Sequence, residues 1–470
     1  MDTATELLER LQNKMKLLSS QQDWAKYCCI YTVPHSLRNM KPLAYTPQLI
    51  SIGPLHHGDE RLKAMEEQKL RYLEVFIEQN EMDEMRIMDL LSSIHKDEDI
   101  HMDEEYIRLC YPHRLEQIES IDLVEMIVLD SVFIIEFFKK LTAEFFNDST
   151  ADRPRMFFEP RMTFCILEDL MLLENQLPFF VIEKIFKNFN LDRQDIEYID
   201  GNGITFLDLA AFHFRKLTFT QGAEYEQQIL VMNFTDLLRN FMLKGALKRS
   251  NYTESIKLKY SAIMLRKAGI KFKVSRDNCL INIQFENGRE NRPDPIKLKY
   301  NAAMLRKAGV KFQKTEDKCL FNVHFEKGVL KIPILKVDDS LECLVRNVMA
   351  WEQRSKPGEA YISNYFKFMD HLIDKAEDVA LLGEEGIIIN WLGDDAALMN
   401  NLSQRSETAS YYSDICQDLN EYSENPWNSR KATLKLVYFS NLWRGTGTVA
   451  AAFLLILTLL QTITSLKSSF

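Results

Sequence analysis

Glycine and proline are scarce in this sequence, which contains 16 of the first and 13 of the second among 470 residues. Both residues interrupt regular structure, so their scarcity excludes a collagen-like or low-complexity chain and favours long helices. A hydrophobic content of 46% excludes wholesale disorder. A chain of this length is expected to form two or three packed units, or one large helical body with appendages.

Positive charge is not in excess either, because the formal net charge is −10. Proteins that bind the phosphate backbone of nucleic acids usually carry a basic surface, so we expect no nucleic acid partner. The eight cysteines include no CxxC pair. In a chain of this length they are interpreted as mostly reduced, buried thiols rather than as a disulfide framework.

Catalytic and metal-binding motifs are absent, since the sequence contains no HExxH, GxxxxGK[ST], GxSxG or EF-hand loop. We therefore assign no catalytic residue, no cofactor and no metal. The N-terminus lacks both an uninterrupted apolar core and a small-residue cleavage site, which excludes a signal peptide. Apolar residues at helical spacing instead predict an amphipathic helix within residues 1–27.

Residues 45–73 hold the densest group of conformationally special residues, with Gly53 and Gly58 on either side of His56 and His57. Adjacent histidines on an ordered turn seldom ligate one metal, so hydrogen bonding within the fold is the preferred role. The next helix is predicted at about 60–78. Its apolar face comprises Leu62, Met65, Leu70, Leu73, Phe76 and Ile77, with Glu66, Glu67, Lys69 and Arg71 on the remainder.

Three adjacent polar residues, Glu174, Asn175 and Gln176, interrupt an otherwise apolar stretch at 167–186. Polar side chains in a core need hydrogen-bond partners. We expect them to cap and cross-link neighbouring helices, with ligand binding as the alternative. The candidate structural or functional residues are therefore His56, His57, Glu66, Lys69, Glu174, Asn175 and Gln176. Further helices are predicted at 121–146, as a buried core helix, and at 341–354, 361–382 (ending at Gly383) and 387–402.

An internal duplication relates residues 256–288 to residues 296–328 at an offset of 40. Each copy is predicted to form a helix that ends at a glycine, followed by two short strands. Only the second copy continues into a further extended segment, so it is interpreted as the integral copy and the first as an insertion or a gene-model error. The cations of the repeat suggest a face for anionic lipid or an acidic partner, with an ordinary solvated face as the alternative. They are Lys257, Lys259, Arg266, Lys267, Lys271 and Lys273, then Lys297, Lys299, Arg306, Lys307 and Lys311.

The segment from Thr448 to Leu466 is apolar apart from Gln461 and small hydroxyl residues, and it has the length of a transmembrane helix. Four cations precede it and only Lys467 follows it, which predicts a cytosolic body on a tail anchor in the plasma membrane or an endomembrane. Four N-x-S/T sequons would suit the opposite orientation, at Asn147, Asn233, Asn251 and Asn401.

Several blocks resemble the plant DUF247 family (UPF0481 proteins): YTPQLISIGPLHHG, MIVLDSVFIIEFF, EDLMLLENQLPFFVIEKIF, AGVKF, RNVMAWEQ and INWLG. The chain differs from the family in Ser131-Val132, where a Gly-Cys pair is usual, and in the duplicated block. The resemblance implies a plant membrane protein with a helical body and no established biochemical activity. Some grass members are implicated in self-incompatibility, a recognition process, which favours interaction over catalysis.

The predicted fold is mainly α, with a large helical body, a small β element (short strands around 280–286 and 320–337) and a single C-terminal transmembrane helix. The predicted organisation is an N-terminal helix (1–27), a helical body (28–402), a polar linker and juxtamembrane segment (403–447) and the span (448–466). The predicted function is that of a membrane-anchored, non-enzymatic interaction or signalling protein with an unknown protein partner. The alternative is an enzyme of unrecognised type with a site near His56 and His57.

Overall fold

The structure is a computed structural model of the chain. It describes residues 27–95, 104–112, 115, 117–146, 160–189, 205–217, 230–243, 273–274, 301–307, 310–315, 323–337, 339–390, 411–433 and 442–468. These residues are mainly helical with a few short strands, which confirms the predicted fold class.

The chain divides into two compact units. Unit 1 comprises residues 1–242 and 340–357, and unit 2 comprises residues 243–339 and 358–470. Unit 1 is therefore completed by a segment that follows it by about a hundred positions in the sequence. The domain bounds predicted from composition are not tested by this division and stay predictions.

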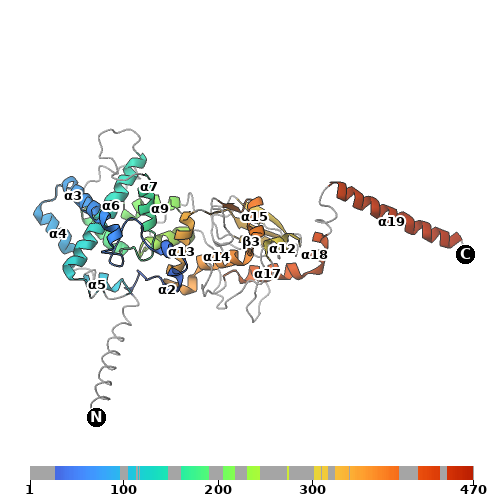
Figure 1. The fold of residues 1–470 in the computed structure, drawn as a ribbon, viewed down its shortest axis with the longest axis horizontal. Coiled ribbons are helices and arrows are strands. Elements are labelled where there is room, and N and C mark those ends of the chain that lie inside the picture. Colours follow the sequence, from blue (N-terminus) through green and yellow to red (C-terminus); the bar gives the residue numbers. More distant parts are fainter. Residues whose placement is uncertain are drawn as a thin grey trace, which may run out of the picture. The chain divides into compact units, whose positions relative to one another are not determined.

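The regular elements of the described part of unit 1 are helices, joined by irregular segments (Figure 1). Its α-helices are α2 (His35–Arg38), α3 (Lys63–Gln79), α4 (Glu84–His95), α5 (Glu104–Leu109), α6 (Ser120–Phe146), α7 (Pro160–Asp169), α8 (Phe179–Phe189), α9 (Phe206–Leu217), α10 (Phe234–Leu243) and α13 (Asp339–Ser355). Two short 3-10 helices, η1 (Pro42–Tyr45) and η2 (Glu60–Leu62), lie in the connection between α2 and α3.

The long helix α6 is the centre of unit 1, and it packs against α3, α4, α8 and α9. Phe133, Phe137 and Phe138 on α6 are fully buried and meet aromatic rings of neighbouring helices, including Phe206 and Phe214 of α9. Each such ring contributes roughly 1.5–3 kcal/mol by leaving water. The prediction of a buried core helix at 121–146 is confirmed.

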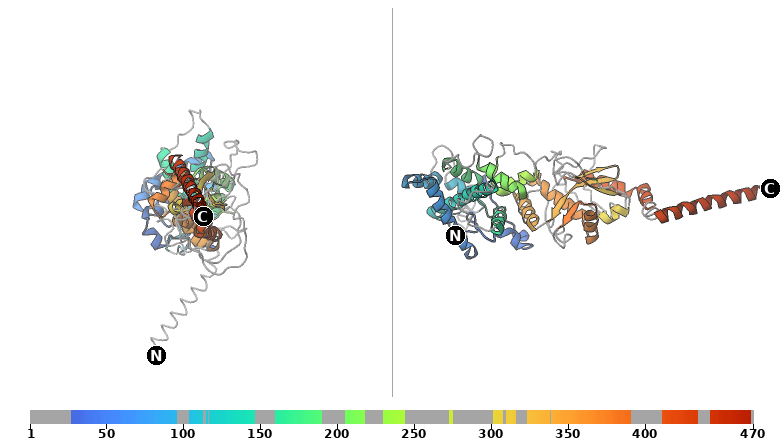
Figure 2. Two further views of the ribbon diagram at one scale, coloured as in Figure 1. Left: turned by 90° about the vertical axis from the view of Figure 1, so that its right-hand side faces the viewer. Right: turned by 90° about the horizontal axis from the view of Figure 1, so that it is seen from above.

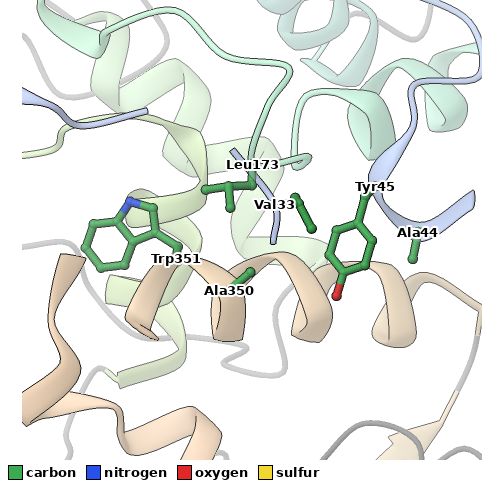
Figure 3. Packing of buried hydrophobic residues seen from close by; sticks show 6 residues of the cluster. All are labelled: Val33, Ala44, Tyr45, Leu173, Ala350 and Trp351. Atoms are coloured by element: carbon green, nitrogen blue, oxygen red, sulfur yellow. The ribbon is translucent and has the colours of Figure 1, made fainter. Parts of the chain in front are cut away.

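A second apolar cluster joins α13 to the N-terminal part of unit 1 (Figure 3). Ala350 and Trp351 lie on α13, and the side chains of Val33, Tyr45 and Leu173 gather over this helix. The side chain of Asn347, also on α13, accepts a hydrogen bond from Leu173 N at 2.9 Å and donates one to Ala44 O at 2.7 Å. The predicted helix at 341–354 is confirmed as α13.

Unit 2 contains the strands β1 (Lys273–Val274), β2 (Lys311–Thr315), β3 (Val323–Glu326), β4 (Val329–Pro333), β5 (Leu335–Val337) and β6 (Ile388–Asn390). Its helices are α12 (Ala302–Lys307), α14 (Tyr361–Leu372), α15 (Ala376–Glu384), α17 (Ser413–Glu424), α18 (Pro426–Thr433) and α19 (Leu442–Ser468), with a 3-10 turn η4 (Pro357–Glu359).

Four of the strands form one sheet in the order β1-β3-β4-β2. β3 and β4 form an antiparallel hairpin whose turn is Lys327-Gly328, both with positive φ. β2 pairs in parallel with β4, and β5 pairs in parallel with β6 in a separate two-stranded sheet. The strands predicted around 320–337 are confirmed, whereas those predicted around 280–286 lie outside the described residues.

Two sequence predictions in unit 2 are wrong. The helix predicted over 361–382 is two helices, α14 and α15, because Ile373 is extended and the Asp378 side chain accepts the N–H groups of Asp374 and Lys375. Gly383 lies inside α15 and does not end it. The helix predicted over 387–402 is wrong at residues 388–390, which form strand β6, and its remainder, residues 391–402, lies outside the described part of the chain.

Helix α19 is a single long helix at the C-terminal end (Figure 2). Its window Thr446–Thr464 has a mean hydropathy of 1.9, and none of that window is buried inside the protein. This 19-residue window has the length and composition needed to cross a bilayer, and most of its large apolar side chains are exposed.

Candidate functional site

The segment 48–53 crosses the interior of unit 1 without a strand partner among the described residues, so its backbone N–H groups need other acceptors. Three acidic or amide side chains from other elements supply them. Gln48, Leu49 and Ile50 donate to the Asp169 carboxylate at 2.7–2.9 Å, Ile52 donates to Asn175 at 2.7 Å, and Gly53 donates to Asp130 at 2.7 Å. We call segment 48–53 with Asp130, Asp169 and Asn175 the brace.

Asp169 is the last residue of α7 and is 3% exposed. Burial raises the pKa of its carboxyl to about 6, while the three N–H groups that it accepts act in the opposite direction. The carboxylate fixes three consecutive residues of the segment in one geometry. This role is structural, and the hydrogen bonds use both of its oxygens.

Asn175 and Gln176 are completely buried, and their amides bind the backbone. Besides accepting from Ile52, Asn175 donates to the carbonyls of Ile50 and Asp169, both at 3.0 Å. Gln176 donates to two carbonyls of the preceding turn and accepts from Phe234 N at 2.9 Å, at the start of α10. Each amide therefore connects segments that are distant in the sequence, in the manner predicted for cross-linking residues.

Glu174 lies at the edge of the brace, where its carboxylate forms hydrogen-bonded and ionic contacts. Its carboxylate accepts from Val33 N at 2.6 Å, forms an ion pair with Arg38 and lies 3.5 Å from His56 Nε2. Burial alone would raise the pKa of Glu174, but the contacts with His56 and Arg38 outweigh it and lower the pKa. The carboxylate is thus held in its charged form by two cationic or polar side chains.

Lys69 is fully buried on α3, and its ammonium meets three oxygens. Nζ lies 2.5 Å from Asp130 Oδ1, 2.7 Å from Glu66 Oε1 and 2.6 Å from the carbonyl of Ser51. Burial acts to lower the Lys69 pKa, but the two carboxylates dominate and raise it, so the side chain is charged. Asp130 therefore holds both the lysine and the N–H of Gly53.

The predicted apolar face of the 60–78 helix is wrong at two positions. Leu70 is 54% exposed, whereas Lys69 is buried. The reason is that the α3 surface beside α6 meets the carboxylate of Asp130, which stabilises an ammonium where a leucine would leave that charge without a partner.

Gly53 is positioned by contact as well as by hydrogen bonding. Its φ is +73°, and a Cβ at this position would lie 2.4 Å from the carbonyl oxygen of Gln176. That carbonyl also accepts a hydrogen bond from the Tyr111 hydroxyl at 3.0 Å. Only glycine fits here without displacement of the backbone.

Six of the seven candidate residues contact the brace or its neighbours in three sets. His56 meets Glu174, and Glu66 meets Lys69, while Asn175 and Gln176 bind backbone groups. His57 is exposed, one position from the buried contact of His56. Among the described residues, no group of three or more His, Cys, Asp or Glu side chains is placed to hold a metal ion.

Sequence reasoning missed Asp130 and Asp169, which supply most of the acceptors for the brace. A signal was present for both. Asp130 is a charged residue in the apolar run that became α6, and Asp169 precedes the polar triplet within an apolar stretch. A charge inside a core segment implies a partner elsewhere in the chain, but not which partner.

The chain is similar to plant proteins of one family. The family model DUF247, described as a plant protein of unknown function, matches residues 30–290 and 286–457. A UPF0481 protein of Arabidopsis thaliana is 26% identical over 94% of this chain and 87% of its own length. A putative UPF0481 protein of the same plant is 24% identical over 94% of this chain and 90% of its own length. No solved structure matches the chain significantly.

Proposed function

The chain belongs to the DUF247 family of plant proteins, and from this premise we propose that it is a membrane-anchored, non-enzymatic interaction protein. The observation that carries the proposal is α19: an uninterrupted helix with a mean hydropathy of 1.9 over Thr446–Thr464 and no burial inside the protein. A helix that is apolar on all sides needs either a protein core or lipid around it. Lipid is the environment that we assign to α19.

The candidate residues support a scaffold role for the brace rather than catalysis. Lys69 is charged and its ammonium is engaged by three oxygens, so a free amine is not presented to a substrate. The carboxylate of Asp169 is used by three backbone N–H groups. An enzyme at His56 and His57 has less support, because one ring contacts Glu174 and the other is exposed to solvent.

We assign the partner surface to the repeat region of unit 2. In the described part of the second copy, Lys311 and Lys314 are exposed on β2, at the end of the strand order, while Arg306 pairs with Glu384 at 2.8 Å. Exposed lysines on an outer strand discourage unspecific strand addition and attract anions. An acidic protein segment or an anionic lipid surface is the chemistry that this edge favours.

We place the body in the cytosol, because four cations precede the apolar segment 448–466 and one follows it within the sequence. One of the four sequons carries no weight for the opposite orientation. Asn233 is fully buried, its amide donates to Cys29 O at 2.7 Å, and its Oδ1 accepts from Asp236 N. A glycan at Asn233 is incompatible with the folded unit.

Protease protection in plant microsomes tests the proposal, with the full-length chain carrying an N-terminal tag. We expect the protein to stay with membranes in alkaline carbonate, and the tag to be digested without detergent and to show no glycosidase shift. The control is a chain that ends before Leu442, which is expected in the soluble fraction. Release of the full-length chain by carbonate would contradict the assignment of α19 as a membrane anchor. A protected, glycosylated body would contradict the cytosolic orientation.

A further inference from the structure

Two cysteines distant in the sequence are adjacent in unit 1. Cys29 lies in the segment that precedes α2, and Cys110 directly follows α5. The backbone carbonyl of Cys110 accepts hydrogen bonds from the N–H groups of both Cys29 and Ile30, each at 3.0 Å. Both cysteines are buried, with 7% and 1% of their surface exposed.

The separation of the two backbones suits a disulfide. A 3.0 Å backbone N–H···O=C bond places the two α-carbons on either side of it roughly 5–6 Å apart, given standard bond lengths. Disulfides occur at α-carbon separations of roughly 4.4–6.8 Å. The two side chains also interact: the contact with Cys110, ahead of burial, raises the pKa of the Cys29 thiol well above its ordinary value. The Cys110 Sγ itself donates to the carbonyl of Tyr106 at 3.4 Å.

The adjacent Cys28 provides an internal comparison. It is as buried as Cys29, but its thiol donates to the carbonyl of Ile30 at 3.4 Å. Successive side chains of an extended segment point to opposite sides, so one of the two cysteines faces Cys110 and the other does not. Cys28 and Cys29 are equally buried, so burial does not identify the partner of Cys110. The position of Cys29 relative to Cys110 does.

We propose that Cys29 and Cys110 form a disulfide site that is oxidised by a small-molecule disulfide such as oxidised glutathione. The Cys29 thiolate attacks one sulfur of oxidised glutathione and releases one glutathione thiolate. The Cys110 thiolate then attacks the Cys29 sulfur of the mixed disulfide and releases the second. Two cysteine thiols are oxidised, one glutathione disulfide is reduced to two glutathione thiols, and no other reactant is needed.

The bond would close a loop that contains the brace segment 48–53, α2, α3 and α4. It would fix the point at which the N-terminal segment enters unit 1, because residues 29 and 30 are already bound there. Burial and the raised pKa of Cys29 make the exchange slow in the closed fold, so the bond forms when this segment opens. A body that faces the cytosol keeps the two thiols reduced, whereas a lumenal or exterior body forms the bond.

The test uses the full-length protein in detergent, which makes it independent of membrane orientation. The protein is equilibrated at pH 8 in buffers of increasing oxidised-to-reduced glutathione ratio, with mild urea to permit local opening. It is then quenched with acid, alkylated and mapped by mass spectrometry with and without reduction. We expect a reducible peptide pair that joins Cys29 to Cys110 and accounts for most of the protein at high oxidised glutathione.

The matched variants are Cys28→Ser, Cys29→Ser and Cys110→Ser. The linked pair is expected to persist in the first and to be absent from the other two. Free Cys29 and Cys110 thiols in wild-type protein at a large excess of oxidised glutathione would overturn the proposal, and so would a predominant bond to Cys28. The wild-type map decides the question even if a serine variant fails to fold.

Discussion

Gly53 is the residue at which the brace tolerates least change. Two factors disfavour any larger side chain at this position: the φ of +73°, and the carbonyl oxygen of Gln176, which would lie 2.4 Å from a Cβ. We expect Gly53→Ala to destabilise unit 1 by at least about 3 kcal/mol, since a left-handed conformation alone costs an alanine roughly 1–2 kcal/mol and the overlap with backbone adds to it. Chemical denaturation of the full-length protein in detergent measures this.

Gly58 is the matched control, because it lies in the same turn region with a φ of +80° but has nothing within 4 Å of a Cβ position. Gly58→Ala should cost only the conformational part, about 1 kcal/mol. Equal losses for the two variants would mean that the close approach between Gly53 and Gln176 does not constrain the protein.

Lys69 shows what a helical pattern can and cannot predict for a single residue. The pattern located α3, and the polar triplet was correctly expected to need partners inside the core. The burial of Lys69 could not be read from α3, because its cause is Asp130 on another helix. Ion pairs between distant segments leave no periodic trace in either one.

At the scale of elements, long periodic segments were predicted well and short connections were not. The segments predicted at 121–146 and 341–354 correspond to α6 and α13. The break between α14 and α15 was missed because apolar spacing continues across it while a polar side chain ends the first helix and caps the second. A run of isoleucines such as that at 387–389 suits strand and helix alike, and its pairing with β5 decides the outcome.

Asp378 is the residue that caps α15. Its carboxylate accepts from Asp374 N at 3.1 Å, Lys375 N at 2.9 Å and, from α12, Ala303 N at 2.9 Å. Burial raises its pKa to about 8. The folded state thus binds this proton more tightly than the unfolded state, whose pKa is near 3.8, so the stabilisation from the proton is lost as pH rises toward 8.

We expect the free energy of unfolding of unit 2 to fall by about 1–2 kcal/mol between pH 6.5 and 8.5, because one pKa unit corresponds to roughly 1.4 kcal/mol. Asp378→Asn should abolish this slope. It should also lower stability at pH 6.5 by about 1–3 kcal/mol, since its amide nitrogen cannot accept the N–H group that faces it. Guanidinium unfolding at several pH values measures both effects.

The exposed Asp414 on α17 serves as the control for this measurement. Asp414→Asn should keep the slope of the wild-type protein. A slope that survives in Asp378→Asn would assign the pH dependence to another group and contradict the role of this cap.

At the scale of the whole molecule, the sequence pattern did not indicate that α13 packs into unit 1 rather than into unit 2. Periodicity predicted the helix, but the contacts of Asn347 with Leu173 and Ala44 connect positions that no local signal relates. The duplication, in contrast, was visible in the sequence. The two segments matched by the family model overlap at residues 286–290, at the end of the first copy.

The second copy supplies most of the described sheet of unit 2, whereas the first contributes the two residues of β1 at its edge. Its buried side chains include Leu305, Phe312, Val323 and Phe325. Each contributes roughly 1.5–3 kcal/mol, and together they approach the 5–15 kcal/mol that stabilises a typical domain. The second copy is therefore expected to be indispensable for the stability of unit 2.

Deletion of residues 256–295 removes one repeat length and joins residue 255 to the start of the second copy at the equivalent position. We expect this variant to keep a cooperative unfolding transition of unit 2, because β2, β3, β4 and their buried side chains remain. The control of equal length, deletion of residues 296–335, removes β2, β3, β4 and their buried side chains, and should abolish the transition of unit 2. Circular dichroism and limited proteolysis follow both. Equal tolerance of the two deletions would mean that either copy can form the sheet. It would contradict the interpretation of the first copy as an insertion.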